Sequence, residues 1–252
     1  MKKIAIYGKG GIGKSTISCN ISAALAKSGL SVMQIGCDPK ADSTSLLRGG
    51  ERIPTVLQLT REKGKSLTLG EIVFEGAYGA KCVEAGGPVP GLGCAGRGII
   101  NALETLGTLG AYDVYKPDVV IYDVLGDVVC GGFSMPMRKG YADEVIVVTS
   151  GEKMSVYAAA NICMAVDNFK GRGYARLGGI ILNRRGVEDE DKAAAELAMD
   201  FGTTVIADID RCTEIPLAEK AGKPVFEVCP ESAAAEQLAA AANAVLATFG
   251  EV

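Results

Sequence analysis

The sequence contains no histidine. Histidine is the usual proton carrier near neutral pH and the commonest protein ligand of zinc, so its absence excludes histidine-based catalysis and zinc sites with histidine ligands. Acid–base chemistry must therefore use Asp, Glu, Lys or water. Any metal centre must use cysteine or carboxylate ligands.

Long apolar segments and clusters of basic residues are absent as well. No segment approaches the roughly 20 apolar residues that span a bilayer, and the N-terminus enters a predicted strand at once. We therefore expect no signal peptide, no membrane contact and a cytoplasmic location. The net charge is −4, with acids and bases interleaved, which argues against a nucleic-acid partner. Small ligands and other proteins are the expected partners.

Apolar runs alternate with helical patterns along the chain. This alternation predicts an α/β fold, a mainly parallel sheet with helices on both faces. At 252 residues, of which 48% are hydrophobic, the chain should form a single domain over residues 1–252. The predicted strands are Lys3–Tyr7, Ser31–Ile35, Asp118–Tyr122, Glu144–Thr149, Gly178–Leu182 and Thr204–Ala207. The predicted helices cover residues 14–28, 97–110, 154–170 and 189–201, with a packed terminal helix from Ala233 to Phe249.

The segment after the first predicted strand fits the P-loop pattern G-x-x-x-x-G-K-[ST] and opens a helix, as that motif of P-loop NTPases requires. Its backbone N–H groups and the helix N-terminus would wrap the phosphates of a nucleotide. Lys14 should reach the β- and γ-phosphates, and Ser15 should hold Mg²⁺. The expected nucleotide-binding residues here are Gly8, Lys9, Gly10, Gly11, Ile12, Gly13, Lys14, Ser15 and Thr16.

Lys9 is a second lysine within this loop. In a subclass of dimeric P-loop ATPases, such a lysine contacts the nucleotide across the subunit interface. Lys9 therefore indicates a symmetric dimer that closes on ATP, and the alternative is a solvated surface lysine. The Asn-Lys-x-Asp guanine reader of GTPases is absent, and the nearest segment begins at Asn183. ATP is therefore favoured over GTP.

Acidic residues follow two further predicted strands. Asp38 and Asp42 suit a switch that senses Mg²⁺ and water, or alternatively the cap of a helix. The apolar run Val119–Tyr122, a predicted buried strand, directly precedes Asp123. It would place the Asp123 carboxylate near a Mg²⁺-bound phosphate. Asp127 and Cys130 leave that strand on one short segment. Nucleotide state and cysteine chemistry would thereby be joined mechanically.

The eight cysteines, in a reducing compartment, argue for thiols or metal ligands rather than disulfides. Cys94 precedes a predicted helix, whose dipole would stabilise a thiolate, and Cys130 is flanked by glycines that admit N–H donors. Two cysteines are half of the four thiolates of an iron–sulfur cubane, and a two-fold dimer would supply the others. Cys82 is a competing candidate, within a glycine-rich stretch from Gly76 to Gly98 that we predict to be one long irregular insertion. The sequence contains no C-x-x-C pair, which argues against a thioredoxin-like redox site.

Four segments together resemble the nitrogenase iron protein and its relatives, the ATP-dependent reductases of the nitrogenase superfamily. They are Tyr7–Thr16, Gly36–Thr44, Gly93–Gly98 and Tyr122–Phe133. The similarity extends over nearly the whole chain. It implies a homodimer with one MgATP per subunit and one [4Fe–4S] cluster, held at the interface by Cys94 and Cys130 of both subunits.

The same resemblance implies roles for the charged residues. Lys9 would act across the interface, and Asp38, Asp42 and Asp123 would surround the metal ion and water. Asp127 would orient the attacking water or accept its proton, which fits the need of phosphoryl transfer for positioning and charge neutralisation. Lys9, Asp38 and Asp127 are thus the expected catalytic residues.

Two further matches concern partners and the base. Arg97 matches a residue with which the family docks to its electron acceptor, and which is ADP-ribosylated in some members. Asn183 matches a position that contacts the base. Near the adenine, this chain has Asp210-Arg211-Cys212 where nitrogenase iron proteins usually have Pro-Arg-Asp.

The activity implied is ATP-gated electron transfer. MgATP hydrolysis would accompany delivery of low-potential electrons to a nitrogenase or nitrogenase-like heteromeric catalytic component, with a ferredoxin or flavodoxin as upstream donor. A hypothesis from a different class is a spatial-regulation ATPase, of the cell-division-site or plasmid-partition kind, without a cluster. Such proteins often end in a basic amphipathic helix, whereas the terminal stretch here is alanine-rich with little basic charge.

Overall fold

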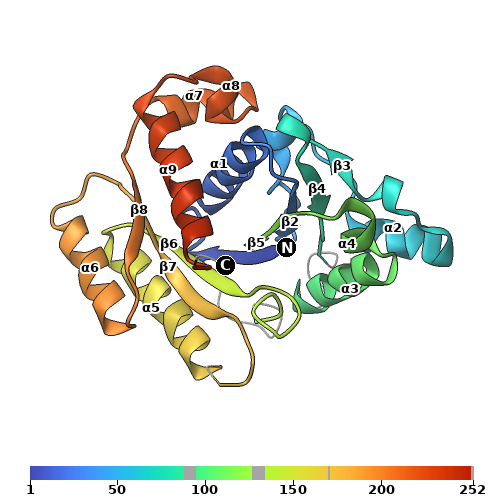
Figure 1. The fold of residues 1–252 in the computed structure, drawn as a ribbon, viewed down its shortest axis with the longest axis horizontal. Helices are drawn as coiled ribbons and strands as arrows, with labels where there is room; N and C mark the ends of the chain where they lie inside the picture. Colours follow the sequence, from blue (N-terminus) through green and yellow to red (C-terminus); the bar gives the residue numbers. More distant parts are fainter. Residues whose placement is uncertain (88–94, 127–133, 170, 251–252) are drawn as a thin grey trace.

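A computed structural model describes residues 1–87, 95–126, 134–169 and 171–250 of the chain. Within these ranges, eight strands form one sheet in the order β3-β4-β2-β5-β1-β6-β7-β8 (Figure 1). The strands are β1 (Lys2–Gly8), β2 (Val32–Cys37), β3 (Phe74–Glu75), β4 (Lys81–Glu84), β5 (Val119–Val124), β6 (Glu144–Thr149), β7 (Arg176–Asn183) and β8 (Val205–Ile209). The short strand β3 is antiparallel to β4, and the other neighbours pair in parallel.

Helices cover both faces of the sheet. One face packs against α1 (Lys14–Lys27), α7 (Glu214–Ala221), α8 (Val225–Val228) and α9 (Ala233–Ala247). The other packs against α2 (Val56–Lys63), α3 (Ala95–Thr108), α4 (Ala111–Tyr115), α5 (Lys153–Asn168) and α6 (Glu190–Asp200). Short 3-10 helices occupy Ser45–Arg48, Gly64–Ser66, Leu69–Glu71 and Ala77–Gly79. In the described ranges, every helix is too short or too polar to cross a membrane.

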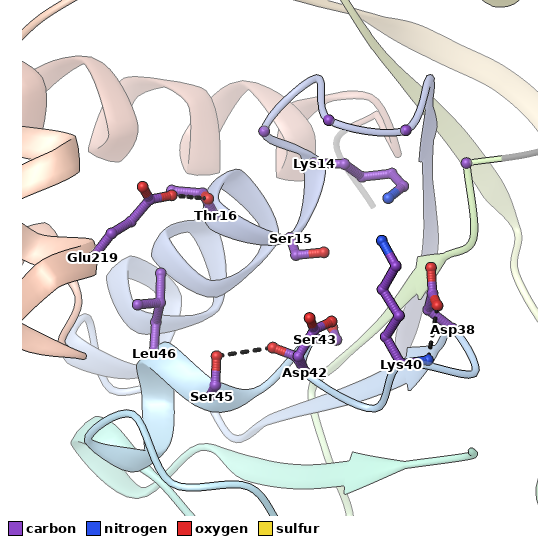
Figure 2. Close-up of a pocket in the computed structure, with 14 residues that line it drawn as sticks. Lys14, Ser15, Thr16, Asp38, Lys40, Asp42, Ser43, Ser45, Leu46 and Glu219 are labelled. Atoms are coloured by element: carbon purple, nitrogen blue, oxygen red, sulfur yellow. Dashed lines mark hydrogen bonds between the residues drawn. The ribbon is translucent and has the colours of Figure 1, made fainter. Parts of the chain in front are cut away.

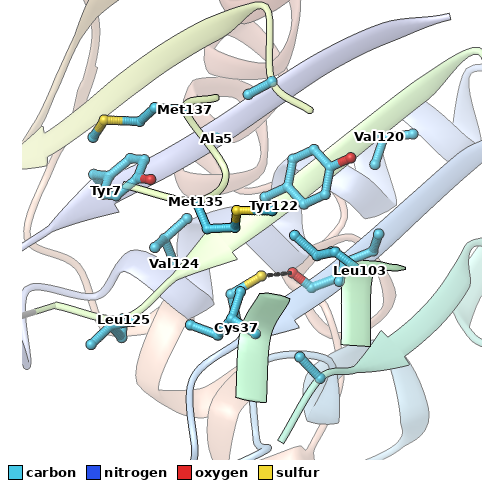
Figure 3. Close-up of a cluster of buried hydrophobic side chains, with 14 of the residues drawn as sticks. Ala5, Tyr7, Cys37, Leu103, Val120, Tyr122, Val124, Leu125, Met135 and Met137 are labelled. Carbon is cyan, nitrogen blue, oxygen red and sulfur yellow. Dashed lines mark hydrogen bonds between the residues drawn. The ribbon is translucent and has the colours of Figure 1, made fainter. Parts of the chain in front are cut away.

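The core consists of two apolar layers, one on each side of the sheet. Along β1, Ile4 and Ile6 belong to the layer under α1 and α9, whereas Ala5 and Tyr7 belong to the opposite layer (Figure 3). In that second layer, the hydroxyl of Tyr122 lies 3.2 Å from that of Tyr112. Strands buried on both faces are apolar at most positions, which explains the apolar runs Val119–Tyr122 in β5 and Val145–Val148 in β6.

The strand order places the functional segments at one edge of the sheet. β1 lies between β5 and β6, so the chain order reverses on either side of it. Asp123 in β5 is in register with Ile6 of β1 and with Gly36 of β2. The loops that leave the carboxyl ends of these three strands therefore meet, as ligand-binding loops do at the switch point of an open α/β sheet.

The predicted α/β fold is confirmed, and each predicted strand and helix ends within two residues of an observed one. The prediction of one irregular insertion over Gly76–Gly98 was wrong, because β4 lies inside it and pairs with β2. Cys82 and Val83 in β4 face opposite core layers, so burial on both sides stabilises a strand that is too short to show a pattern. The elements β3, α2, α4, α7 and α8 were not predicted.

Candidate functional site

The predicted P-loop connects β1 to α1, and its backbone path requires glycine. Gly11 and Gly13 have φ angles of 77° and 94°, in the left-handed region that glycine adopts readily. Gly8 has no room for a side chain, because a Cβ would lie 2.5 Å from the carbonyl oxygen of Val148 in β6. The loop therefore packs closely against the neighbouring strand β6.

A pocket of about 470 Å³ opens beside the P-loop (Figure 2). The residues that line it are Gly10, Gly11, Gly13, Lys14, Ser15, Thr16, Asp38, Lys40, Asp42, Ser43, Ser45, Leu46, Gly126 and Glu219. The structure thus brings Asp38 and Asp42, from the loop after β2, to the predicted phosphate-binding residues. Of the other predicted nucleotide residues, Gly8, Lys9, Ile12, Asp123 and Asn183 lie outside this lining.

A buried polar cluster joins the three loops beneath the pocket. The Lys14 Nζ lies 3.9 Å from Asp123 Oδ1, and the two residues are 8% and 1% exposed. Ser43 donates to Asp123 Oδ2 at 2.6 Å, and the Ser18 hydroxyl lies 3.4 Å from Oδ1. A buried charge is tolerated when it is paired and hydrogen-bonded. Asp123 therefore ties the P-loop lysine to the segment after β2.

Among the lining residues that the sequence analysis missed, two are charged, Lys40 and Glu219. Lys40 extends from the loop after β2 toward Lys14 in Figure 2, while its backbone N–H donates to Asp38 Oδ1 at 2.9 Å. Two ammonium groups that point toward one another favour an anion between them. Glu219, from the unpredicted helix α7, accepts a hydrogen bond from the Thr16 hydroxyl. A lysine two residues after Asp38 was a usable signal, whereas Glu219 is brought in by the tertiary fold.

Side chains at the end of β7 hold the P-loop from its other side. Asn183 Nδ2 donates to the Ile12 carbonyl at 2.6 Å, and Arg185 Nη2 donates to the Gly11 carbonyl at 3.0 Å. Gly13 permits this approach, since a Cβ there would lie 2.7 Å from Asn183 Nδ2. The residue predicted to contact the base thus contacts the loop itself.

Glu84, at the end of β4, anchors the segment after β2. Its Oε1 accepts from both the backbone N–H and the hydroxyl of Thr44, at 2.7 Å each. Its Oε2 has no partner among the described residues and lies where a Cβ on Gly36 would be, at 2.0 Å. Burial raises the pKa of Glu84 to about 7, against the lowering effect of the Thr44 hydrogen bonds.

This pKa predicts a stability that falls as the pH rises. Because burial raises the folded-state pKa from 4.5 to about 7, the folded state holds the proton more tightly than the unfolded state. The protonated Glu84 side chain contributes about 3 kcal/mol to the free energy of unfolding. This contribution is complete below pH 4.5 and is lost as the pH rises to 7. The side chain of Glu84→Gln cannot ionise. Denaturant unfolding should therefore show that the free energy of unfolding falls less between pH 5 and pH 8 in the variant than in the wild type. Equal losses in both proteins would contradict the assignment.

Four predicted site residues lie wholly or partly outside the described part of the chain. Cys94, Asp127 and Cys130 lie outside the described residues, and Arg97 lies in the first turn of α3 with its side chain outside them. Elsewhere in the described chain, no group of three or more His, Cys, Asp or Glu residues could hold a metal ion.

Four of the six described cysteines are poorly placed to act as ligands. Cys19, Cys37, Cys82 and Cys163 are buried, and burial raises the pKa of each thiol, to about 12 for Cys82 and Cys163. Metals bind the thiolate rather than the thiol. Cys82, the competing candidate, is thus a buried residue of β4 that packs against Gly76.

The sheet order, the P-loop and the pocket define a P-loop nucleoside triphosphatase. A solved structure with the same fold is the cell division ATPase MinD of Pyrococcus furiosus, with a TM-score of 0.75, 19% identity and coverage of 98% of this chain and 99% of that one. At this identity the likeness shows the fold alone. A sequence model of the NifH/frxC family of 4Fe-4S iron sulfur cluster binding proteins matches residues 2–250.

Two relatives place the chain within that family. It is 57% identical over 235 residues to the nitrogenase iron protein of Methanospirillum hungatei JF-1, covering 92% of this chain and 83% of the relative. It is 50% identical over 242 residues to nitrogenase iron protein 2 of Methanothermococcus thermolithotrophicus, covering 91% and 83%. The chain belongs to the NifH/frxC family, and like its members it binds a [4Fe–4S] cluster and MgATP. Membership disfavours the cluster-free spatial-regulation ATPase.

Proposed function

We propose that the protein is a homodimeric, ATP-dependent reductase that delivers low-potential electrons to a nitrogenase or nitrogenase-like heteromeric catalytic component. The observation that carries this proposal is the 57% identity to a nitrogenase iron protein over 92% of the chain. The nucleotide pocket supports it, because the chain that leaves β5 lines the pocket at Gly126 and Cys130 follows four residues later in the sequence. The expected electron donor is a ferredoxin or flavodoxin, in the cytoplasm.

The nucleotide would occupy the pocket beside the P-loop. Lys14 and Lys40 would neutralise its phosphates, and Ser15 would hold Mg²⁺ in the manner of P-loop enzymes. Asp38, which lines the pocket, and Asp127, the residue after the lining residue Gly126, would position the attacking water. Phosphoryl transfer needs this placing of charge more than it needs covalent chemistry.

Cys94 and Cys130 of two subunits would hold the cluster, which stores the electron at low potential. Cys94 directly precedes α3, and Cys130 follows the end of β5. The burial of four described cysteines, which raises the pKa of each thiol, supports this choice. Lys9 would contact the nucleotide of the partner subunit, and Arg97 would dock to the electron acceptor.

The test of this proposal is anaerobic purification, followed by iron analysis and EPR of the reduced protein with and without MgATP. About four irons per dimer and a signal that changes with MgATP are expected. A dimer that hydrolyses ATP but holds no iron, even after reconstitution, would instead support the spatial-regulation ATPase.

Gly126 offers a steric test of the coupling between β5 and the P-loop. A Cβ at this position would lie 2.5 Å from the Gly10 nitrogen and 2.8 Å from its Cα. Gly126→Ala should therefore push the two segments apart and weaken MgADP binding by about tenfold or more, a loss of at least about 1.4 kcal/mol. The matched control is Gly107→Ala in α3, where a Cβ meets nothing within 4 Å. Unchanged affinity in Gly126→Ala, measured by calorimetric titration, would refute the close coupling.

A further inference from the structure

The chain that leaves β4, residues 84–87, contacts the loop after β2 along its length. Glu84 accepts hydrogen bonds from the backbone N–H and the hydroxyl of Thr44. The backbone N–H of Ala85 donates to the Gly36 carbonyl at 2.8 Å. The end of β2 and the far end of its loop are therefore both attached to this short segment.

Gly87 contacts the same loop at Pro39, between two residues that line the pocket. A Cβ on Gly87 would lie 2.5 Å from the Pro39 Cβ and 2.9 Å from its Cα. Asp38 and Lys40, on either side of Pro39, both line the pocket (Figure 2). Asp38 Oδ1 accepts from the Lys40 backbone N–H at 2.9 Å, and the Asp38 carbonyl accepts from the Ala41 N–H at 3.0 Å. These residues form one turn, so a displacement of Pro39 would move Asp38 and Lys40 together.

Residues 84–87 are in turn held by the start of α2. The backbone N–H of Leu57 donates to the Ala85 carbonyl at 3.1 Å. A Cβ on Gly86 would lie 2.5 Å from the Cβ of Thr55, the residue that caps α2. Because the segment is held in this way, the loop after β2 is the partner that would yield to a side chain added between them.

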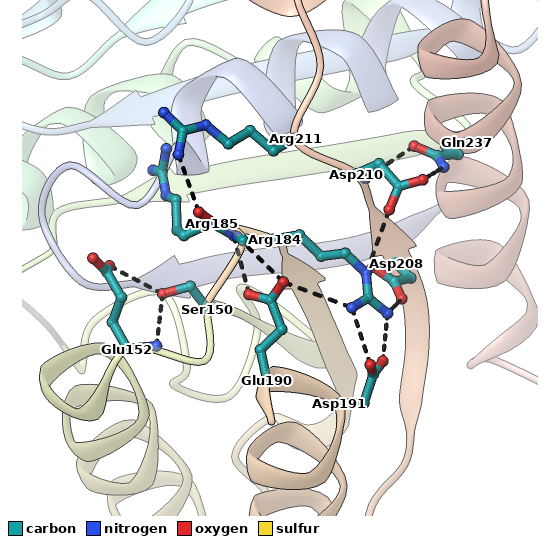
Figure 4. A network of polar contacts seen from close by, with 11 residues as sticks. Ser150, Glu152, Arg184, Arg185, Glu190, Asp191, Asp208, Asp210, Arg211 and Gln237 are labelled. Atoms are coloured by element: carbon teal, nitrogen blue, oxygen red, sulfur yellow. Dashed lines mark hydrogen bonds and ion pairs between the residues drawn. The ribbon is translucent and has the colours of Figure 1, made fainter. Parts of the chain in front are cut away.

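The P-loop, which also lines the pocket, has supports of its own. Asn183 and Arg185 donate to its carbonyls. Arg184, between them, binds Asp208 in β8 and Asp191 in α6 (Figure 4). Apart from their link through β5, the P-loop and the loop after β2 thus depend on different strands, β7 and β4.

We propose that Gly87 is a positioning residue for Asp38 and Lys40, an inference that rests on the proposed nucleotide site. The absence of a side chain lets Pro39 approach, and this approach sets how far Lys40 reaches toward Lys14. A Cβ on Gly87 would have to retreat from 2.5 Å to an ordinary contact of about 3.5 Å. The turn would then move by about 1 Å, and an error of that size in placing a functional group can cost about a hundredfold in rate.

The test measures the affinity for the magnesium complex of adenylyl imidodiphosphate, an ATP analogue that is not hydrolysed, by calorimetric titration. Gly87→Ala should bind the analogue about tenfold more weakly than the wild type, as should Lys40→Ala. The double variant should bind it no more weakly than Lys40→Ala alone, because no ammonium group is then left to misplace. General damage to the fold would instead give losses that add in the double variant.

Pro39→Gly is a second variant, which needs no new atoms beside Gly87. It loosens the turn, so it should weaken binding by a smaller factor, and again without further effect in Lys40→Ala. The matched control is Gly70→Ala, where a Cβ meets nothing within 4 Å and the affinity should stay that of the wild type. Full affinity in Gly87→Ala or Pro39→Gly, or additive losses in the double variant, would overturn the positioning role. A wild type that binds no analogue would instead refute the proposed nucleotide site, which is a distinguishable result.

Discussion

Replacing either Cys94 or Cys130 by alanine is expected to remove the iron from the protein, from about four atoms per dimer to none. Four thiolates hold a cubane cluster, and a two-fold dimer with one ligand removed from each subunit would retain only two of them. Cys19 and Cys37 are unsuited to replace them, because both are buried thiols with strongly raised pKa values. Iron and sulfide analysis of the anaerobically purified variants gives the result directly.

Control variants separate ligand loss from general damage. Cys212 and Cys229 are half-buried, and their alanine variants should keep a full complement of iron. Cys94→Ala should still bind MgADP, because the pocket is built from other segments. Loss of iron in Cys82→Ala together with retention in Cys94→Ala would move the ligand assignment to Cys82.

Replacing Lys14 by alanine is expected to weaken MgATP binding by about a hundredfold or more, at least about 2.7 kcal/mol. The variant loses the cation that faces the phosphates, and it leaves the buried Asp123 carboxylate with only its serine partners. Breaking a buried pair typically costs 3–5 kcal/mol when one charge is left behind. Stability should therefore fall along with affinity, as calorimetric titration and denaturant unfolding would show.

A second substitution distinguishes the two effects. Adding Asp123→Asn to Lys14→Ala removes the unpaired charge, so stability should return while the affinity for MgATP stays low. Lys27→Ala, in the last turn of the same helix, should leave nucleotide binding unchanged. Wild-type affinity in Lys14→Ala would mean that the pocket beside the P-loop is not the phosphate site.

Much of the site was predictable because local sequence patterns indicate it. The spacing of the glycines indicates the P-loop, and the position of Asp38 and Asp123 at the ends of apolar runs indicates their place near the phosphates. Glu84 was missed because its four-residue strand lies in a glycine-rich stretch and its partner, Thr44, is 40 residues away. The contacts of Arg184 depend in the same way on the packing of β7, β8 and α6, which no local spacing encodes.

The central position of β1 also sets the order in which the protein can be completed during synthesis. β1 is the first strand made, yet its neighbours in the sheet are β5 and β6, and Gly8 is fitted against Val148. The ribosome must therefore release the chain beyond β6 before both neighbours of β1 are in place beside the P-loop. It must release the chain beyond Asn183 before that side chain can bind the Ile12 carbonyl. Pairings so distant in sequence form late. The nucleotide pocket can therefore be complete only in a chain whose translation is well advanced.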